Sequence, residues 1–471
     1  MKKRYFLIFK SFNFLIAATL LVSCGLYNKY ERPDKVETSG LIRDVLSDRD
    51  TLAVQDTASF GNLPWRQVFT DPQLQALIEQ GLQKNSNLLN AALTVQMYET
   101  MLKAAKLAFL PAIQIGSTTS PMGSISTLHT DPSVTTKAYS IPATASWTLD
   151  LFGNILSQKR STQMKLLGFK DYQMAVRAQV ISGIANCYYT LLMLDKQLEI
   201  VTEMSAMSKE TWEMMKLQYQ LGRVRSTGVQ SAEAAYLSTQ TQANDFRRQI
   251  RATENALSLL IGQQGQQIPR STLEAQSLPT EFSTGVGVAL LKSRPDVHNA
   301  EMQLAACFHD IQTARSQFYP NVTIGASAAF TNSSGALNPG KWLTTLFGSL
   351  TQPIFMRGAL TANLKVSKLQ YEQAFNTWQN SILSAGNEVS NALVNYNGYD
   401  ANSKLEAQRV EILKQNVEDT KALYKSSGSS YLEVITAQTQ LLSAQLNMVT
   451  DDFNKMQAVV SLYTALGGGG K

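Results

Sequence analysis

The stretch NAEMQLAACFHDIQTARSQFYPNVTIG, from Asn299 to Gly325, decides the fold because the chain contains it twice in related form. The earlier copy, NAALTVQMYETMLKAAKLAFLPAIQIG, begins 209 residues before it at Asn90. Each copy predicts a helix, then a proline (Pro111 or Pro320), then a strand in which apolar and polar residues alternate. Proline ends the helix because it lacks a backbone N–H and biases its predecessor towards extended structure. The chain therefore contains an internal duplication of one helix–strand unit.

The duplication continues along the chain at an offset of 205 residues, which pairs Tyr219 with Tyr424. The change from 209 to 205 corresponds to a net loss of four residues in the second copy. We assign the first structural repeat to residues 65–275 and the second to residues 276–471. The 471 residues thus predict one repeated architecture and not two unrelated domains.

Each repeat is predicted to contain two strands, because period-two alternation places apolar residues on one face and Ser, Thr, Gly or Gln on the other. The predicted strands cover residues 112–120, 139–151, 321–330 and 342–355. Two of them include a proline, Pro142 or Pro353. Since proline cannot donate a ladder hydrogen bond, these two strands are expected at sheet edges or bulges.

Long helices are predicted for the remainder of each repeat. No proline occurs in residues 143–268 or 354–471, and each window has one break, at residues 222–228 and 426–430. Each window therefore predicts a helical hairpin whose turn lies at that break. The arms are expected to contain about 40–60 residues each, or about 60–90 Å at 1.5 Å per residue.

The N-terminus has the pattern of a targeting segment. A basic start and a short apolar run make residues 1–23 a predicted signal peptide, because the run is too short to span a bilayer. It ends in LVSCG at residues 21–25, which resembles the bacterial lipobox. Cleavage is then expected between Ser23 and Cys24, with a lipid on the Cys24 thiol and an extended, lipid-anchored segment over residues 24–64. The alternative is an ordinary signal peptide with an incidental cysteine.

Four strands are too few for a membrane barrel. Such barrels start at about eight strands, because an open edge in lipid leaves backbone groups unsatisfied. Two chains would supply eight strands, whose lumen is filled by side chains, and three would supply twelve, which can leave an opening. An antiparallel sheet covered on its apolar face by helices would show the same alternation. The pattern alone leaves both interpretations open.

Several short motifs resemble a known family, the TolC-like outer-membrane efflux proteins, and within it the lipoprotein branch of the OprM/NodT type. The resemblance covers nearly the whole mature chain and depends on the order of the motifs, the duplication and the lipobox together. The motifs are Tyr30–Pro33, Trp65, Phe69–Pro72 with Leu74, Asn87-Leu88 with Ala91, Ser293–Val297, Tyr319-Pro320 and Tyr431–Gln438.

The resemblance implies a mainly α-helical chain with a transmembrane β part. Three chains would form one twelve-stranded barrel in the outer membrane of a Gram-negative bacterium, continued by a tunnel of coiled α-hairpins in the periplasm. The implied function is a passive exit duct from the periplasm, in a tripartite efflux system of the RND type or a type I secretion system. The implied partners are the other two copies, a membrane fusion (adaptor) protein, an inner-membrane transporter and outer-membrane lipid, with no nucleic acid. No cofactor is implied beyond the covalent lipid.

The resemblance also carries over two groups of site residues. The hairpin turns contact the fusion protein in the family and correspond here to Leu221, Gly222, Arg223, Val224, Arg225, Ser427, Gly428, Ser429 and Ser430. An acidic gate just above the turns corresponds to Glu433 and Thr436, of which only Glu433 keeps a carboxylate. Three copies of Glu433 would form a ring that favours cations. The plainer interpretations are ordinary turn glycines and a solvated helix face.

No pattern indicates an enzyme or a metal site. The three histidines, His129, His298 and His309, lack the spacing of zinc ligands, and no serine or cysteine lies in a nucleophile motif. A second class of function stays open beside the duct. It is a lipid-anchored periplasmic coiled-coil scaffold without channel activity, whose strands form a soluble sheet.

Overall fold

The structure is a computed structural model. It describes residues 28–33, 60–115, 118–120, 138–279, 294–332, 341–426 and 430–470. Ser23, Cys24 and the turn residues Ser427, Gly428 and Ser429 lie outside the described residues. The chain divides into two compact units, which we call the sheet unit and the helical unit. The sheet unit comprises Met1–Val36, Val95–Phe169 and Asn299–Trp378; the helical unit comprises Glu37–Thr94, Lys170–His298 and Gln379–Lys471.

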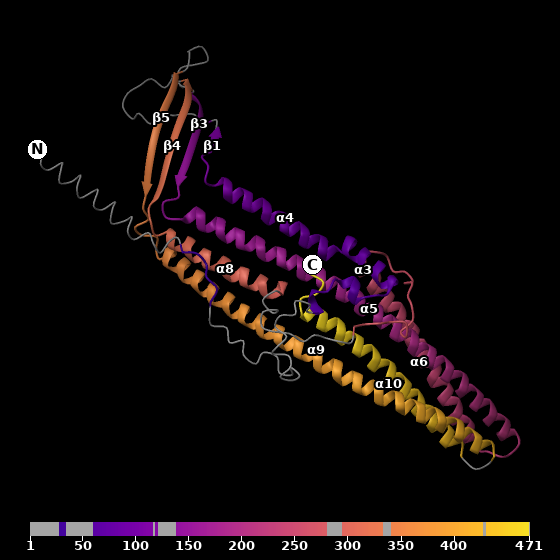
Figure 1. Ribbon diagram of the computed structural model, residues 1–471. Coiled ribbons are helices and arrows are strands. Elements are labelled where there is room, and N and C mark those ends of the chain that lie inside the picture. Colours follow the sequence, from indigo (N-terminus) through magenta and orange to yellow (C-terminus); the bar gives the residue numbers. More distant parts are fainter. Residues whose placement is uncertain are drawn as a thin grey trace, which may run out of the picture. The chain divides into compact units, whose positions relative to one another are not determined.

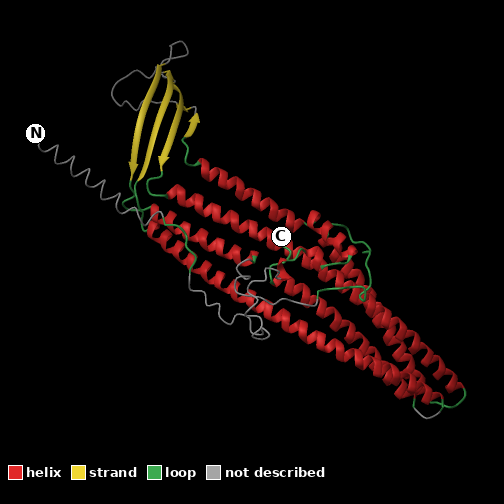
Figure 2. Cartoon of the chain, viewed as in Figure 1, coloured by secondary structure: helices red, strands yellow, loops and turns green. Residues whose placement is uncertain are grey.

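One antiparallel sheet forms the strand part of the sheet unit, and both repeats contribute to it (Figures 1 and 2). Its strands are β1 (Ala112–Ile115), β2 (Thr118–Ser120), β3 (Ala138–Leu149), β4 (Asn321–Asn332) and β5 (Lys341–Thr351). β1 and β2 both pair with β3, β3 pairs with β4 across the two repeats, and β4 pairs with β5. The described sheet therefore has four strand positions, with β1/β2 at one edge and β5 at the other.

The two prolines lie differently from the sequence-based expectation. β5 ends at Thr351, four residues before the predicted end, so Pro353 follows the strand. β3 contains Pro142 and is an interior strand, so the expectation of an edge strand was wrong. β1 and β2 pair with β3 on one side, and β4 of the second repeat pairs with it on the other, where Pro142 lies opposite Ala329. β3 is interior because β4 of the second repeat pairs with it, and the position of a proline does not reveal such a partner.

The register separates an apolar from a polar face of the sheet. The apolar face carries Ile113, Trp147, Ile324, Leu346 and Leu350. The polar face carries Thr144, Thr148, Thr323, Ser327, Thr345 and Ser349. On that face the hydroxyl oxygens of Thr148 and Thr323 lie 3.5 Å apart. The large side chains of the apolar face are exposed, Leu346 by 85%, so the single chain leaves this face uncovered.

Helices make up most of the described chain. They are η2 (Phe60–Asn62), α2 (Trp65–Val68), α3 (Pro72–Lys84), α4 (Ser86–Leu107), α5 (Asn154–Gln220), α6 (Ser226–Leu260), α8 (Pro295–Ser316), α9 (Ala359–Lys425) and α10 (Tyr431–Ala465). Among the described residues, no helix has both the length and the apolarity of a membrane span.

The lengths of the hairpin arms repeat within the chain. α5 and α9 each contain 67 residues, and α6 and α10 each contain 35. The prediction of 40–60 residues for each arm was therefore wrong. The short arms stop at Gly262 and Gly467, which have φ values of 68° and 83°. Each is a left-handed residue just after the helix, the position that glycine favours.

A contact network ties the ends of the strands to the helices in the sheet unit. The rings of Phe152 and Tyr319 stack with their centroids 4.9 Å apart. The Asn154 amide donates to the Ser316 hydroxyl at 2.7 Å. The Asp150 carboxylate accepts two backbone N–H groups at the start of α5, at 3.1 and 2.7 Å. These contacts fix where α5 begins and where α8 gives way to β4.

Tyr30 and Arg32 hold the described N-terminal segment against α8 and α9 in the sheet unit. The Tyr30 ring meets the Phe308 ring edge-on, with 5.9 Å between centroids. The Arg32 guanidinium pairs with the carboxylate of buried Glu301 and lies 5.7 Å from the centroid of the Trp378 ring. The Tyr30–Pro33 motif thus contains the residues that fasten this segment to the fold.

A polar network in the helical unit centres on Asp71, the N-cap of α3. Its carboxylate accepts hydrogen bonds from the Gln73 backbone N–H (2.8 Å), the Tyr188 hydroxyl (2.6 Å) and the Gln276 amide (2.8 Å). The Ser271 hydroxyl donates to it as well. Burial raises the pKa of the Asp71 carboxyl, but the four hydrogen bonds outweigh burial and hold the pKa below its ordinary value. The network joins α3 to α5 and to the segment that follows α6.

Candidate functional site

The first hairpin turn, residues 221–225, joins α5 to α6 (Figure 1). Gly222 has a φ of 68°. Its N–H donates to the Tyr219 carbonyl, and the N–H of Arg223 donates to the Gln218 carbonyl, both at 2.9 Å. This pair of bonds is the Schellman motif, which satisfies the last carbonyls of α5. A side chain at Gly222 would meet open space, so the backbone conformation, and not crowding, favours glycine here.

The surface of the first turn combines apolar and basic side chains. Tyr219 and Leu221 are each more than half exposed. Arg223 and Arg225 are exposed and Val224 is half-buried. The predicted contact residues of this turn therefore offer a partner both apolar area and positive charge.

Methionine and tyrosine side chains join the two hairpins directly behind the turns. The Tyr424 hydroxyl donates to the Met215 sulfur at 3.2 Å. A Cβ atom on Gly228 would lie 2.7 Å from the Met215 methyl carbon and 3.3 Å from the Tyr431 ring, so this glycine permits close packing. Met215 and Gly228 were not among the predicted site residues. Gly228 lay at the end of the predicted break at residues 222–228, and the offset that pairs Tyr219 with Tyr424 lay nearest to Met215.

The second turn leads into α10 at Ser430, the N-cap of that helix. The Ser430 hydroxyl donates to the Glu433 carboxylate at 3.4 Å, and the Glu433 N–H donates to the Ser430 carbonyl at 3.1 Å. Thr436 is exposed, and its hydroxyl donates to the Leu432 carbonyl within α10 at 2.7 Å. The fold thus brings Ser430 and Glu433 together at the start of the helix, where the helix dipole stabilises a carboxylate. Glu433 and Thr436 are three residues apart on one exposed face.

The two hairpins differ at the level of the predicted gate. By the 205-residue offset, Gly228 stands at the position of Glu433, and Ser231 at that of Thr436. Gly228 is buried, whereas Glu433 is exposed. At these two equivalent positions each copy of the chain therefore presents one carboxylate, from the second hairpin.

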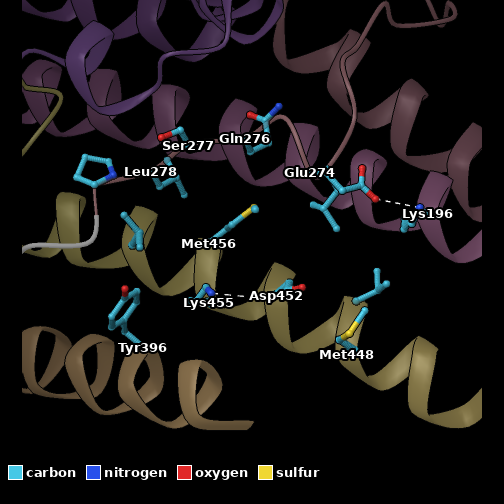
Figure 3. Close-up of a pocket in the computed structure, with 14 residues that line it drawn as sticks. Lys196, Glu274, Gln276, Ser277, Leu278, Tyr396, Met448, Asp452, Lys455 and Met456 are labelled. Carbon is cyan, nitrogen blue, oxygen red and sulfur yellow. Dashed lines mark ion pairs between the residues drawn. The ribbon is translucent and has the colours of Figure 1, made fainter. Parts of the chain in front are cut away.

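A pocket of about 430 Å³ lies in the helical unit between α5, α9, α10 and the segment after α6 (Figure 3). Two lysines on its lining are paired. The Lys196 ammonium is 2.9 Å from a Glu274 oxygen, and that of Lys455 is 3.8 Å from an Asp452 oxygen. The pocket contains none of the predicted site residues. We assign it no part in transport.

A small sheet with an uncovered apolar face, two copies of a long helical hairpin, and an exposed first turn occur together in this chain. Together they are the features of an outer-membrane channel subunit. The model of the outer membrane efflux protein family matches residues 77–263 and 286–468, one match in each repeat. The chain belongs to this family.

Curated relatives match over most of their length. The cation efflux system protein CusC of Escherichia coli K12 is 25% identical over 455 residues, which are 96% of this chain and 98% of CusC. The solvent efflux pump outer membrane protein SrpC of Pseudomonas putida is 29% identical over 411 residues, or 86% of this chain and 87% of SrpC. The probable outer membrane lipoprotein SilC of Salmonella typhimurium is 24% identical over 415 residues, or 87% of this chain and 89% of SilC.

Solved structures share the fold. A CusC crystal structure superposes with a TM-score of 0.81 at 24% identity, covering 94% of this chain and 99% of that one. The crystal structure of the CmeC outer membrane channel of Campylobacter jejuni superposes with a TM-score of 0.82 at 20% identity. The match covers 94% of this chain and 95% of CmeC. The predicted resemblance and fold class are thereby confirmed. The family acts in transport at the outer membrane, and the comparisons favour the channel over the scaffold.

Proposed function

We propose that three copies of this chain close one twelve-stranded barrel in the outer membrane and form the exit duct of a tripartite efflux pump of the RND type or of a type I secretion system. The observation that carries this proposal is the pair of open sheet edges, β1/β2 and β5. In lipid, open edges leave backbone groups without partners. Pairing β5 of one copy with β1/β2 of the next removes every edge once the ring closes.

A line of exposed apolar side chains on α9 supports a contact between copies. Its members are Leu383, Val394, Leu405, Ile412 and Leu423. They are 11 or 7 residues apart, close to whole numbers of helical turns, so they lie along one side of the helix. Each is 49–69% exposed. A long apolar line of this kind is typical of a surface that binds another protein.

The first repeat indicates what covers this line. By the 205-residue offset, Leu405 and Ile412 correspond to Ile200 and Met207 of α5. Ile200 is only 6% exposed, and Met207 packs against the core with the Lys421 ammonium 3.6 Å from its sulfur. Lys421 belongs to the second repeat, so the second repeat covers part of the line on α5. We infer that the first repeat of a neighbouring copy covers the line on α9. Such head-to-tail contacts generate a ring when the rotation between copies closes.

Three copies fit the duct role better than two. Two copies supply eight strands, and an eight-stranded barrel is filled by its own side chains. Three copies supply twelve strands and leave room for a lumen lined by the polar face of the sheet. The apolar face then meets lipid, which is the environment its exposed Ile113, Leu346 and Leu350 side chains require.

The proposed partners follow from the family and from the exposed first turn. Leu221–Arg225 and residues 427–430 are proposed to contact the fusion protein, which connects the duct to an inner-membrane transporter. The names of CusC and SrpC describe components of an efflux system and an efflux pump, which supports this role. The apolar and basic surface of the first turn suits a fusion-protein end that carries apolar and acidic side chains.

The lipid anchor is proposed on Cys24, in keeping with the description of SilC as a probable outer membrane lipoprotein. Cys24 precedes Tyr30 by six residues, which can span at most about 20 Å. Phe308, against which Tyr30 packs, precedes Asn321 at the start of β4 by 13 residues, or about 20 Å of helix. A tether of this length can bring the lipid to the level at which β4 enters the membrane.

Cys24→Ser is expected to abolish incorporation of radiolabelled palmitate, because the thiol is the acylated group. Ser23→Ala keeps a small residue before the cysteine and is the matched control, with incorporation retained. Palmitate still attached to the Cys24→Ser variant would contradict the assignment.

Glu433→Gln is expected to lower the cation preference of the channel in planar bilayers, on the order of twofold, because a ring of three carboxylates is lost. Glutamine preserves the side chain that a capping box requires, so the start of α10 should be undisturbed. Glu411→Gln removes a carboxylate from the exposed surface of α9 and serves as control. If the reversal potential and the block by Mg²⁺ are unchanged while the trimer persists, Glu433 has no part in the gate.

A further inference from the structure

Among the polar-face positions whose side chains the structure describes, one carries a large apolar residue. Phe347 lies on β5 between Thr345 and Ser349, its neighbours on the same face, and pairs with Gly325 of β4. At the other positions of this face whose side chains the structure describes, the residues are Thr, Ser, Gln, Asn, Ala or Gly. An aromatic ring among these small and polar side chains calls for an explanation.

The ring lies directly over Gly325. A Cβ atom on that glycine would be 2.3 Å from the Phe347 Cζ atom and 2.9 Å from the Ala145 carbonyl oxygen, so only glycine leaves room for the ring. Covering a strand glycine in this way stabilises a sheet. The contact with Gly325 does not bury the ring, however, because Phe347 remains 40% exposed. Its uncovered side faces away from the strands of this chain, on the polar side of the sheet.

The position of Phe347 along the strand places it away from either end of the sheet. It precedes Thr351 by four residues, and Thr351 pairs with Asn321 at the edge from which the helices continue. Four residues correspond to about 13 Å of strand. In the proposed barrel, three Phe347 rings would therefore stand at one level inside the lumen, with hydroxyl-bearing side chains above and below them.

We propose that Phe347 is a contact site for flat, uncharged aromatic molecules on the wall of the lumen. This role rests on the proposed trimeric barrel with its polar face inward. An exposed aromatic ring gains from stacking with another ring and from the apolar area that stacking removes from water. The polar neighbours Thr345 and Ser349 keep the wall beside the ring hydrated, so the attraction comes from the ring itself. Binding at one shallow site is weak enough to allow passage, as conduction requires.

Current recordings test this contact with a defined probe. The wild-type trimer is reconstituted in planar bilayers, and 2-naphthol is added to one side. Wild type is expected to show brief, concentration-dependent current blocks. Phe347→Ser is expected to show about tenfold fewer blocks, since the stacking partner is lost. Thr345→Ser, a change on the same face of β5, should leave block frequency at the wild-type level.

A second variant separates contact with the probe from support of the sheet. Phe347→Leu keeps an apolar side chain over Gly325 but removes the flat ring, so it too should show fewer blocks, with trimer yield unchanged. Blocks at wild-type frequency in Phe347→Leu or Phe347→Ser would overturn the contact site. A wild-type channel that conducts without blocks would overturn it and leave the duct intact. A wild-type trimer that does not conduct would overturn the duct and the contact site together.

Discussion

Ile412→Glu is expected to convert the trimer into monomers. Ile412 is 69% exposed in the single chain and belongs to the apolar line on α9 that the proposed neighbour covers. Burying an unpaired carboxylate there costs about 3 kcal/mol or more at each interface, or about a 100-fold loss of association per contact. Size-exclusion chromatography with light scattering in detergent measures the outcome.

Ala407→Glu is the matched control for this experiment. Ala407 is exposed on the same helix, five residues before Ile412 and therefore about 140° around its circumference. The substitution adds the same charge away from the apolar line, and the trimer should persist. If Ile412→Glu remains as trimeric as Ala407→Glu, α9 does not provide the contact between copies.

Asp71→Ala is expected to destabilise the helical unit by about 3–5 kcal/mol, because three side-chain donors lose their charged acceptor and α3 loses its N-cap. The donors are those of Tyr188, Ser271 and Gln276. Thermal unfolding followed by circular dichroism measures the change. Glu79→Ala, which removes a half-exposed ion pair with Arg66, is the control and should cost less than about 1 kcal/mol.

The stability that Asp71 contributes to the fold should decrease at low pH. The pKa of its carboxyl is lowered in the folded chain. The carboxylate therefore contributes its full stability when the pH is above about 4, the ordinary pKa of an aspartate. That contribution is lost as the pH falls through the lower pKa of the folded state. The difference in melting temperature between wild type and Asp71→Ala should be large at pH 7 and should shrink below about pH 4. A difference that stays constant or grows at low pH would contradict the hydrogen-bonding account.

Local signals made much of the fold predictable. Pro320 and the alternation after it led to a strand predicted from residue 321, and β4 begins at Asn321. Gly222 predicted the first turn because glycine readily adopts the left-handed backbone conformation that ends a helix, and it does so here. The unequal arms were missed because prolines were used as the limits of the helical windows. α6 ends just before Gly262, which lies seven residues before Pro269. The left-handed glycine, and not the proline, sets the length of this helix.

The sequence pattern could not predict contacts between residues that lie far apart along the chain. The Asp71-Pro72 pair was noted, but its partners Tyr188, Ser271 and Gln276 follow 117 to 205 residues later, and no local pattern links them to it. The interior place of β3 depends on strand order, which alternation does not encode. For the candidate gate, the position of Glu433 followed from the resemblance. Its bond to Ser430 came from the structure.

Single-channel recording of the wild-type protein tests the central claim most directly, namely that several copies of this chain complete one open barrel. Detergent-purified trimer added to a planar bilayer should insert and produce discrete, uniform current steps, because twelve strands with a polar inner face enclose water. An intact trimer that inserts into the bilayer and produces no current would contradict the account.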